Sequence, residues 1–388
     1  MIYTHVLNRG GKWVRSPVIW PGSRTGRNRL RTLQPLGSGD TLRSQLLYKL
    51  ESQGVHMSRQ IRQFQRLLRA AASMLVFRAA LLPAQSLDLE NGREITIPYS
   101  REHSLVSQIN GREYRILVAL PFSYRTAADD TTRYPVLYLL DGNMELPLFA
   151  SMFRLTNRGR AGDVILIGIG YPPSTPPGTP PPGRGQIPYR QRDYTPPAYP
   201  PSSTADSALQ EQSPQSGGAP LFHRALKEEI IPFVEKHYRT SGDRGIHGHS
   251  FGGLFATYIL FEDPDIFTRY AITSPSLGWD NYSMFGREAE FAKRNPPLPK
   301  TVYLSVGTNE SPEMISVMWR LASVLCDGFW SKTRYQGLEI ITSINADEYH
   351  QSAVPFVRAL AALYPSRLPG RTGVVPPAVR TCGAGVEP

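Results

Sequence analysis

Cysteine and long apolar runs are both scarce in this chain. Its 388 residues include two cysteines, Cys326 and Cys382, and their spacing does not match a metal site. We therefore expect no bound metal and no cofactor, and we expect two separate thiols, with a disulfide as the alternative. No apolar run reaches the roughly 18 residues that a membrane-spanning helix needs. The sequence thus predicts no integral membrane segment.

Acidic residues are nearly absent from the start of the chain. Residues 1–86 contain 14 Lys and Arg but 2 Asp and Glu, and this segment accounts for the net charge of +11. The rest of the chain holds 29 basic and 30 acidic residues and is close to neutral. The high isoelectric point, near 9.7, therefore carries no information about the substrate, and we expect no nucleic-acid partner.

The basic segment contains the pattern of a secretory signal. From Met57 it reads MSRQIRQFQRLLRAAASMLVFRAALLPAQS, in the order basic, apolar and small, although Arg78 interrupts the apolar stretch. A signal would make Met57 the start of a periplasmic or secreted protein. The equal alternative is a disordered basic arm or a surface helix on a cytoplasmic protein.

Residues 87–369 show the alternation of an α/β domain. Short apolar runs at 113–121, 133–143 and 163–172 end in turn residues, as strands buried on both faces of a parallel sheet do. The segment 221–239 instead has apolar residues at helical spacing. This pattern predicts a mostly parallel central sheet with helices on both faces.

Two segments depart from that alternation. Residues 172–220 are rich in Pro, Ser, Gly and Gln and hold almost no aliphatic residue, so we expect a partly disordered insertion that lies over the site. Residues 370–388 are expected to form a loose tail. We see no internal repeat, and the pattern indicates no particular oligomeric state.

One glycine-rich stretch has the form of a nucleophile elbow. Gly248-His249-Ser250-Phe251-Gly252 follows a short predicted strand and opens a predicted helix. An elbow holds the serine at a strained backbone angle, so the residues two before and two after it must be nearly free of side chain. Both are glycine here. A plain glycine-rich turn between strand and helix is the alternative.

A serine nucleophile needs a base, and in this arrangement the acid and then the histidine follow the serine in the chain. His350 is the one histidine after Ser250, and it follows the last predicted strand. Glu310 ends the preceding strand and is the preferred acid, whose role would be to hold the imidazole. The competing acids are Asp280, Asp327, Asp347 and Glu348.

An oxyanion hole would need backbone amides near the serine. We expect the amide of Phe251 and an amide in the Asp-Gly-Asn turn after another strand, at Gly142 or Asn143. A plain turn is the alternative for the second position.

Several motifs together resemble one family. YPVLYLLDGN, LKEEIIPFVEKHYR, GHSFGGLFA, ITSPSLGWDN, YLSVGTNE and EYHQSAVP occur in order, over about residues 114–363. They resemble the Putative esterase family of α/β-hydrolases, which includes enterobactin (siderophore) esterases, esterase D-type enzymes and mycolyltransferases. The resemblance implies the α/β-hydrolase fold, with Ser250, Glu310 and His350 as nucleophile, acid and base. Gln351 and Gly278 depart from residues common in relatives, and these departures concern the substrate pocket.

The expected function is hydrolysis of a carboxylic ester through an acyl-enzyme on Ser250. An acyltransferase that uses an alcohol in place of water is the alternative, and a binding protein with an inert hydrolase body is a third interpretation. The segment RQRDYTPP resembles one that precedes the site in relatives. Its cations and aromatic ring, with a nearby tryptophan, suit an anionic aromatic ester such as a catecholate siderophore, against the alternative of a solvated loop. These residues are Arg190, Arg192, Tyr194 and Trp279.

Overall fold

The computed structural model describes residues 66–67, 96–126, 131–156, 161–172, 187–294, 296–326, 334–365 and 379–382. The chain divides into two compact units, 1–93 and 94–388, and the second contains nearly all of the described residues. The predicted signal sequence lies outside the described residues apart from 66–67. Within the described ranges, no helix combines the length and the apolar character needed to cross a membrane.

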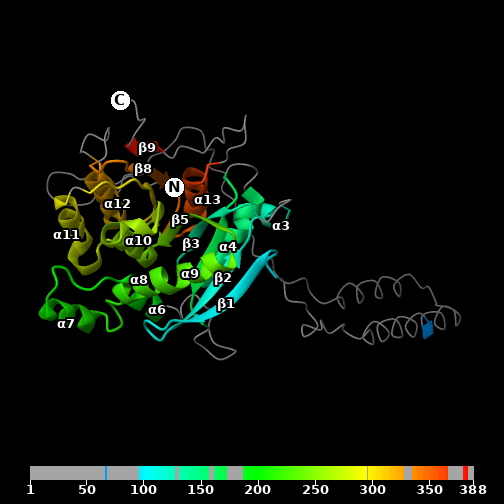
Figure 1. Cartoon of the computed structure of the whole chain (residues 1–388), viewed down its shortest axis with the longest axis horizontal. Helices are drawn as coiled ribbons and strands as arrows, with labels where there is room; N and C mark the ends of the chain where they lie inside the picture. Colours follow the sequence, from blue (N-terminus) through cyan, green and yellow to red (C-terminus); the bar gives the residue numbers. More distant parts are fainter. Residues whose placement is uncertain are drawn as a thin grey trace, which may run out of the picture. The chain divides into compact units, whose positions relative to one another are not determined.

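A single mixed sheet organises the second unit (Figure 1). Its nine strands among the described residues have the order β1-β2-β4-β3-β5-β6-β7-β8-β9. The six central strands, from β4 to β8 in this order, run parallel, and β1, β2 and β9 pair antiparallel with their neighbours. The strands are β1 (Ser100–Val106), β2 (Glu113–Ala119), β3 (Tyr134–Leu139), β4 (Ile165–Gly170), β5 (Thr240–His249), β6 (Arg269–Thr273), β7 (Thr301–Gly307), β8 (Glu339–Asn345) and β9 (Val379–Cys382).

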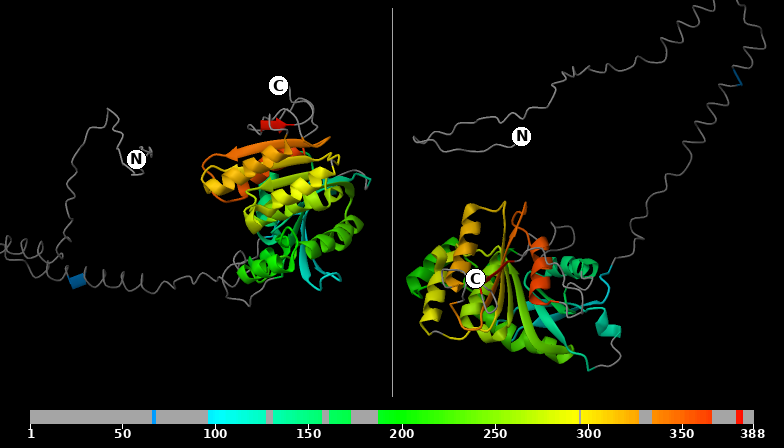
Figure 2. Two further views of the ribbon diagram at one scale, coloured as in Figure 1. Left: turned by 90° about the vertical axis from the view of Figure 1, so that its left-hand side faces the viewer. Right: turned by 90° about the horizontal axis from the view of Figure 1, so that it is seen from above.

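Helices cover both faces of this sheet (Figure 2). One face carries α4 and α13, and the opposite face carries the larger group that includes α8 to α12. This arrangement confirms the predicted α/β-hydrolase type of fold. The helices are α3 (Ser123–Thr126), α4 (Gly142–Thr156), α6 (Ile187–Tyr194), α7 (Ser203–Gln212), α8 (Ala219–Ala225), π-helix η2 (Leu226–Ile230), α9 (Ile231–His237), α10 (Phe251–Glu262), 3-10 helix η3 (Pro264–Ile266), α11 (Trp279–Lys293), α12 (Pro312–Leu325) and α13 (Ala353–Leu363).

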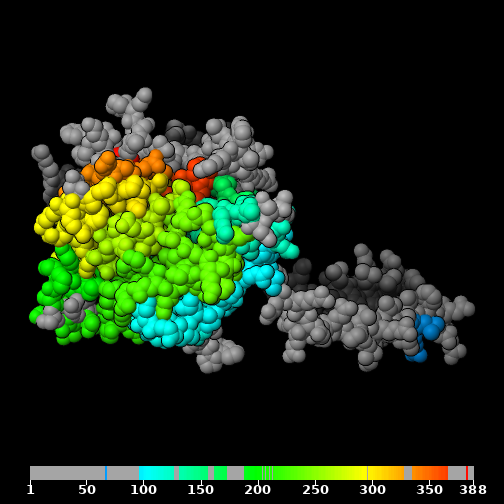
Figure 3. All heavy atoms as spheres, viewed as in Figure 1, coloured from blue at the N-terminus to red at the C-terminus, as the bar shows by residue number. Residues whose placement is uncertain are grey.

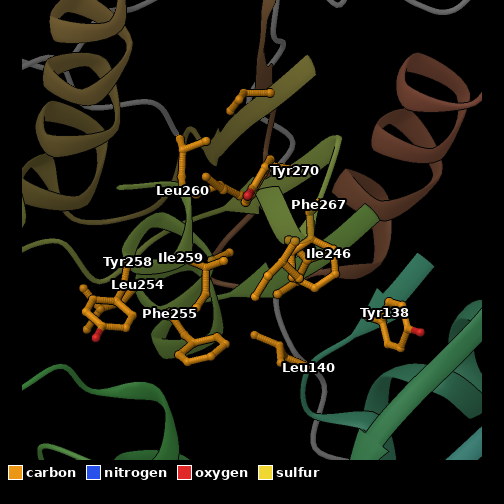
Figure 4. Close-up of a cluster of buried hydrophobic side chains, with 14 of the residues drawn as sticks. Tyr138, Leu140, Ile246, Leu254, Phe255, Tyr258, Ile259, Leu260, Phe267 and Tyr270 are labelled. Carbon is orange, nitrogen blue, oxygen red and sulfur yellow. The ribbon is translucent and has the colours of Figure 1, made fainter. Parts of the chain in front are cut away.

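The unbroken apolar runs of the strands follow from this two-sided burial. Successive side chains of a strand point to opposite faces, so both alternating sets need an apolar partner layer. In β4, Ile165 and Ile167 join one core cluster, whereas Leu166 joins the other. Figure 4 shows part of the first cluster, in which Leu254, Phe255 and Ile259 of α10 lie close to side chains from the sheet.

The expectation for the insertion is wrong over residues 187–220. This part forms α6, α7 and the start of α8, and it contributes to the molecular surface drawn in green in Figure 3. Its order does not depend on aliphatic residues. Asp193 is fully buried and accepts hydrogen bonds from Arg112, at 2.6 Å, and from Arg192, while Tyr194 is fully buried among aromatic rings. Residues 173–186 lie outside the described residues.

The expectation for the cysteines is also wrong, and the expectation for the tail is wrong over residues 379–382. Cys326 and Cys382 form a disulfide, with their Cα atoms 6.2 Å apart, and both are buried. The pairing joins residues 56 positions apart, so it depends on how the sheet brings them together and not on local spacing. Residues Val379–Cys382, within the predicted loose tail, form strand β9 against β8.

Candidate active site

Ser250 lies in a sharp turn between β5 and α10. Its φ of 62° and ψ of −119° fall in a region that residues with a side chain rarely adopt. The neighbouring glycines make this turn sterically accessible. A Cβ on Gly248 would lie 2.1 Å from the carbonyl oxygen of Gly252, and a Cβ on Gly253 would lie 3.0 Å from Pro275. The turn therefore has the backbone geometry that the glycine spacing predicts.

Strained residues also follow the two strands that flank β5. Asp141 follows β3 with a φ of 56°, and Ser274 follows β6 with a φ of 44°. Because β3, β5 and β6 are adjacent and parallel, these turns with Ser250 share the carboxyl edge of the sheet. A residue in such a strained backbone conformation lowers the stability of the fold by about 1–3 kcal/mol. Several of them at one edge of the sheet therefore indicate a functional site.

His350 and Glu310 form a hydrogen-bonded pair at the same edge. The Nδ1 atom of His350 lies 2.8 Å from Oε2 of Glu310, and the glutamate side chain is 1% exposed. The other carboxylate oxygen accepts hydrogen bonds from the Ser274 hydroxyl at 2.5 Å and from the Gly307 amide at 2.9 Å. Burial would raise the pKa of Glu310, but the hydrogen bonds from His350, Ser274 and Gly307 outweigh it and lower this pKa below 4.5.

The pair lies beside the elbow. The ring of His350 is 4.4 Å from the ring of His249, the residue that precedes Ser250. The Ser250 hydroxyl itself has the Ser276 hydroxyl as a hydrogen-bond partner, at 3.3 Å. Burial lowers the pKa of His249 well below its usual value, aided by the neighbouring His350, so His249 is neutral.

The competing acids have other partners or lie elsewhere. Asp280 accepts a hydrogen bond from the backbone amide of Tyr199 at 2.8 Å. Glu348 accepts one from Gln351, and Asp347 is exposed. Asp327 lies outside the described residues. The carboxylate that contacts the His350 ring is thus that of Glu310.

The expected oxyanion residues begin two helices. Phe251 is the first residue of α10, and Gly142 and Asn143 are the first two residues of α4. Amides in the first turn of a helix have no acceptor within that helix, so they are available to an anion. The Asn143 side chain is occupied, because it exchanges two hydrogen bonds with the backbone of Tyr171 at 2.7 and 2.8 Å. A Cβ on Gly142 would lie 2.4 Å from Gly168, which explains the glycine.

Arg190 and Trp279 lie close to the elbow. The guanidinium of Arg190 is paired with the Asp141 carboxylate and stands 5.8 Å from the centre of the Phe251 ring. The Trp279 ring meets Phe251 edge-on at 5.8 Å, and its indole N–H donates to the Pro196 carbonyl. Both predicted substrate residues therefore border the turn that carries Ser250.

Tyr194 does not have the predicted role, and Arg192 has an ion-pair partner within α6. Arg192 donates two hydrogen bonds to the buried Asp193, at 2.7 and 3.0 Å. Tyr194 is fully buried, and its hydroxyl accepts from the Asp141 amide at 2.9 Å. The Tyr194 hydroxyl therefore joins α6 to the turn after β3, whereas Arg192 pairs with a neighbour in its own helix. Successive residues of a helix point in different directions, so this motif does not form one binding surface.

Ser274, Ser276 and Asp141 are site residues that the sequence interpretation missed. Asp141 is the second residue after β3 and Ser274 is the first after β6, so each stands where strand ends meet in a parallel sheet. This position at the end of a strand was the sequence feature from which these two residues could have been predicted. Among the described residues, no group of three or more His, Cys, Asp or Glu side chains is arranged to hold a metal ion.

Comparison with known proteins relates the chain to esterases. A family model described as "Putative esterase" matches residues 187–336. The ferri-bacillibactin esterase BesA of Bacillus subtilis is 30% identical over 243 residues, which cover 58% of this chain and 77% of that protein. A siderophore enterobactin esterase of Emericella nidulans is 31% identical over 195 residues, covering 47% and 61%.

Solved structures show the same architecture. The BES protein from Bacillus cereus superimposes with a TM-score of 0.58 at 26% identity, covering 71% of this chain and 98% of that one. Siderophore hydrolase EstB from Aspergillus nidulans has a TM-score of 0.56 at 21% identity, covering 71% and 97%, and supports the fold alone.

Proposed function

Because the chain belongs to the Putative esterase family of serine hydrolases, we propose that it hydrolyses carboxylic esters through an acyl-enzyme on Ser250. The observation that carries the proposal is the hydrogen bond between His350 and the buried Glu310, at the edge where Ser250 is strained. A nucleophile in a strained turn, a base and a buried acid are the groups that acyl transfer requires.

In the proposed first step, the Ser250 hydroxyl breaks its hydrogen bond with the Ser276 hydroxyl and attacks the ester carbonyl carbon. Its proton passes to the free Nε2 atom of His350, and the ionised Glu310 stabilises the imidazolium. The carbonyl oxygen becomes an anion that the amides of Phe251 and of the α4 start would stabilise. Collapse of this intermediate breaks the ester C–O bond, and His350 returns the proton to the departing alcohol.

In the second step, water attacks the acyl group while His350 accepts one of its protons. The intermediate then releases the carboxylic acid, and the proton returns to Ser250. The His350 side chain is 44% exposed, so water reaches the base directly. Transfer of the acyl group to an alcohol in place of water is the alternative reaction. Product analysis with and without an added alcohol distinguishes the two reactions.

For the substrate, we propose a siderophore-like ester or lactone. The supporting facts are the names of the relatives, which describe esterases of bacillibactin and enterobactin, together with Arg190 and Trp279 at the elbow. A cation and an aromatic ring at the site suit an anionic aromatic ester. A panel from short nitrophenyl esters to siderophore lactones tests this class, and equal kcat/KM across the panel would contradict it.

We also propose that the protein works in an oxidising compartment, in the periplasm or outside the cell. The buried Cys326–Cys382 disulfide supports this, because such bonds persist in oxidising environments. The signal-like order of residues 57–86 supports it independently. Fusion of residues 57–86 to a reporter that is active only after export tests the proposal, and a reporter that stays inactive would contradict the signal.

The first test of the reaction is Ser250→Ala. It should abolish labelling by a fluorophosphonate and lower kcat by about four to six orders of magnitude, because acylation has no other nucleophile. Ser276→Ala is the matched control, since it removes the hydroxyl next to Ser250, and it should still be labelled. If Ser250→Ala retains full turnover, the proposed mechanism is wrong.

A further inference from the structure

The loop that carries His350 is anchored before the histidine by backbone contacts. The amide of Asp347 donates to the Thr308 hydroxyl at 2.8 Å, and the carbonyl of Glu348 accepts from the Asn309 amide at 2.9 Å. Both partners belong to the segment after β7 that leads to Glu310. This side of the loop is therefore fixed to the same region that holds the acid.

After the histidine, the loop is anchored to a different helix. The hydroxyl of Ser352 donates to Oε1 of Glu145 at 2.8 Å, a contact between residues 207 positions apart. Ser352 is the N-cap residue of α13, and serine at this position usually bonds the first amides of its own helix. Here its side chain caps no α13 amide and contacts Glu145 instead.

The contact lies where two helices meet. One turn further along each helix, Phe149 of α4 stacks on Phe356 of α13, with ring centres 3.7 Å apart. Glu145 lies in the first turn of α4, three residues after Gly142, and its amide donates to the Asp141 carbonyl. The carboxyl thus stands between the amides proposed to hold the oxyanion and the loop that carries the base.

We propose that the Glu145 carboxyl is a positioning group, which fixes the His350 loop to the start of α4 and so sets the distance between the base and the oxyanion site. The inference rests on the proposed function, because it assigns a role within that reaction. Glu145 touches no reacting atom in this scheme and acts through His350 and the α4 amides.

The surroundings of Glu145 favour its neutral form. The residue is 4% exposed, and its Oε2 atom is buried with no hydrogen-bond partner among the described residues. The charged neighbours are Asp141, from the turn before α4, and Arg190 of α6, which are paired with each other. His247 of β5, against Phe149, is neutral because burial lowers its pKa to about 3.

Burial raises the pKa of Glu145 to about 8, and the charge of Asp141 adds to this effect, whereas the hydrogen bond from Ser352 and the charge of Arg190 oppose it. At neutral pH the group is therefore protonated, and it adds no negative charge beside the oxyanion site. Above this pKa its ionisation would place a charge there that opposes the developing oxyanion.

The test compares kcat and KM of full-length variants on a nitrophenyl ester. Glu145→Ala should lower kcat about ten- to a hundredfold with KM nearly unchanged, because a displaced base slows the chemical step. Ser352→Ala should cause a similar loss, and the double variant should lose little more than either single variant. Glu145→Gln retains the acceptor for Ser352 and should restore most of the rate. Glu290→Gln, an exposed carboxylate on α11, is the matched control.

A pH profile provides a readout that a purely structural role would not change. The wild-type rate should decline above about pH 8, and Glu145→Gln should remove this decline. The pKa is raised in the folded state, so wild-type stability falls as the pH rises from about 4.5 to about 8. The Tm of Glu145→Gln minus the Tm of wild type should therefore increase between about pH 4.5 and pH 8 and stay constant above pH 8.

The outcomes separate this inference from the proposed function. A wild-type enzyme that depends on Ser250 but loses no kcat in Glu145→Ala or Ser352→Ala would overturn the positioning role. An alkaline decline that survives in Glu145→Gln, or a Tm difference that is constant with pH, would do the same. Activity that is independent of Ser250 would instead overturn the proposed function.

Discussion

Two buried carboxyl groups border the loop of His350 from different regions of the molecule, and they are in opposite charge states. Glu310 has three hydrogen-bond donors, which are Ser274 after β6, Gly307 at the end of β7 and His350 after β8. The start of α4 provides Glu145 with one donor, the Ser352 hydroxyl. The pKa of Glu310 is lowered, whereas that of Glu145 is raised.

The difference shows that burial and hydrogen-bond donors together set the direction in which the pKa of a carboxyl moves. Burial is the largest single influence on both groups and raises both pKa values. Three hydrogen bonds overcome it at Glu310, while one does not at Glu145. Each result suits its region: a negative charge beside the imidazole stabilises the imidazolium, and a neutral group near the α4 amides leaves them free for an oxyanion.

The strongest test removes the residue on which both carboxyls act. His350→Ala should lower kcat by about four to six orders of magnitude, nearly as much as loss of Ser250. In that background Glu310→Gln and Glu145→Ala should each cost less than about twofold, because residues that act as one unit do not contribute additively. Single-turnover rates on an activated ester measure this. A large additional loss from either variant would show a role independent of His350.

Glu310→Gln should have the next largest effect, a loss of about two to four orders of magnitude in kcat. Glutamine retains the shape but removes the charge that stabilises the imidazolium. The loss should exceed that of Glu145→Ala, since Glu145 sets position alone. Asp347→Asn is the control, being an exposed acid of the same loop. If Asp347→Asn is the more damaging variant, the acid has been assigned wrongly.

Ser274→Ala would remove one of the three hydrogen bonds to Glu310 and leave the carboxylate itself in place. Hydrogen bonds to charged groups contribute about 1.5–3 kcal/mol, so loss of this donor should lower kcat by about ten- to a hundredfold. With two donors left, Glu310 should also have a higher pKa, closer to the behaviour of Glu145. Ser316→Ala removes an exposed hydroxyl on α12 and should match wild type in kcat. A Ser274→Ala enzyme with wild-type kcat would contradict the importance of donor number.

The smallest expected effect is a pH dependence of Tm with the opposite sign for the two groups. The pKa of Glu310 is lowered below 4.5, so its contribution to stability is present above that pH and disappears as the pH falls through the folded-state value. The Tm advantage of wild type over Glu310→Gln should therefore narrow below about pH 4.5. Calorimetry between pH 3 and pH 9 measures the Tm of wild type and of both variants. For Glu145→Gln, the Tm difference from wild type should change between about pH 4.5 and pH 8. Parallel curves for the two variants would contradict the opposite charge states.

Local patterns in the sequence were enough to predict the fold and the turn of the candidate site. Uninterrupted apolar runs predict strands buried on both faces, because alternate side chains must enter separate cores. Gly248 predicts the strained turn at Ser250, because the clash that it avoids is with the backbone of Gly252, four positions along the chain. The order of Ser250, Glu310 and His350 along the chain predicts the contact of the last two, since successive parallel strands end at one edge.

The tertiary structure decided everything that depends on burial or on distant partners. It pairs Cys326 with Cys382, and it buries Tyr194 while Arg190 remains beside the elbow. Neither the donors around Glu310 nor the contact of Glu145 with Ser352 shows in local spacing. A glutamate is the same residue wherever it occurs in a sequence. Its charge depends on the desolvation and the hydrogen bonds that only the folded chain provides.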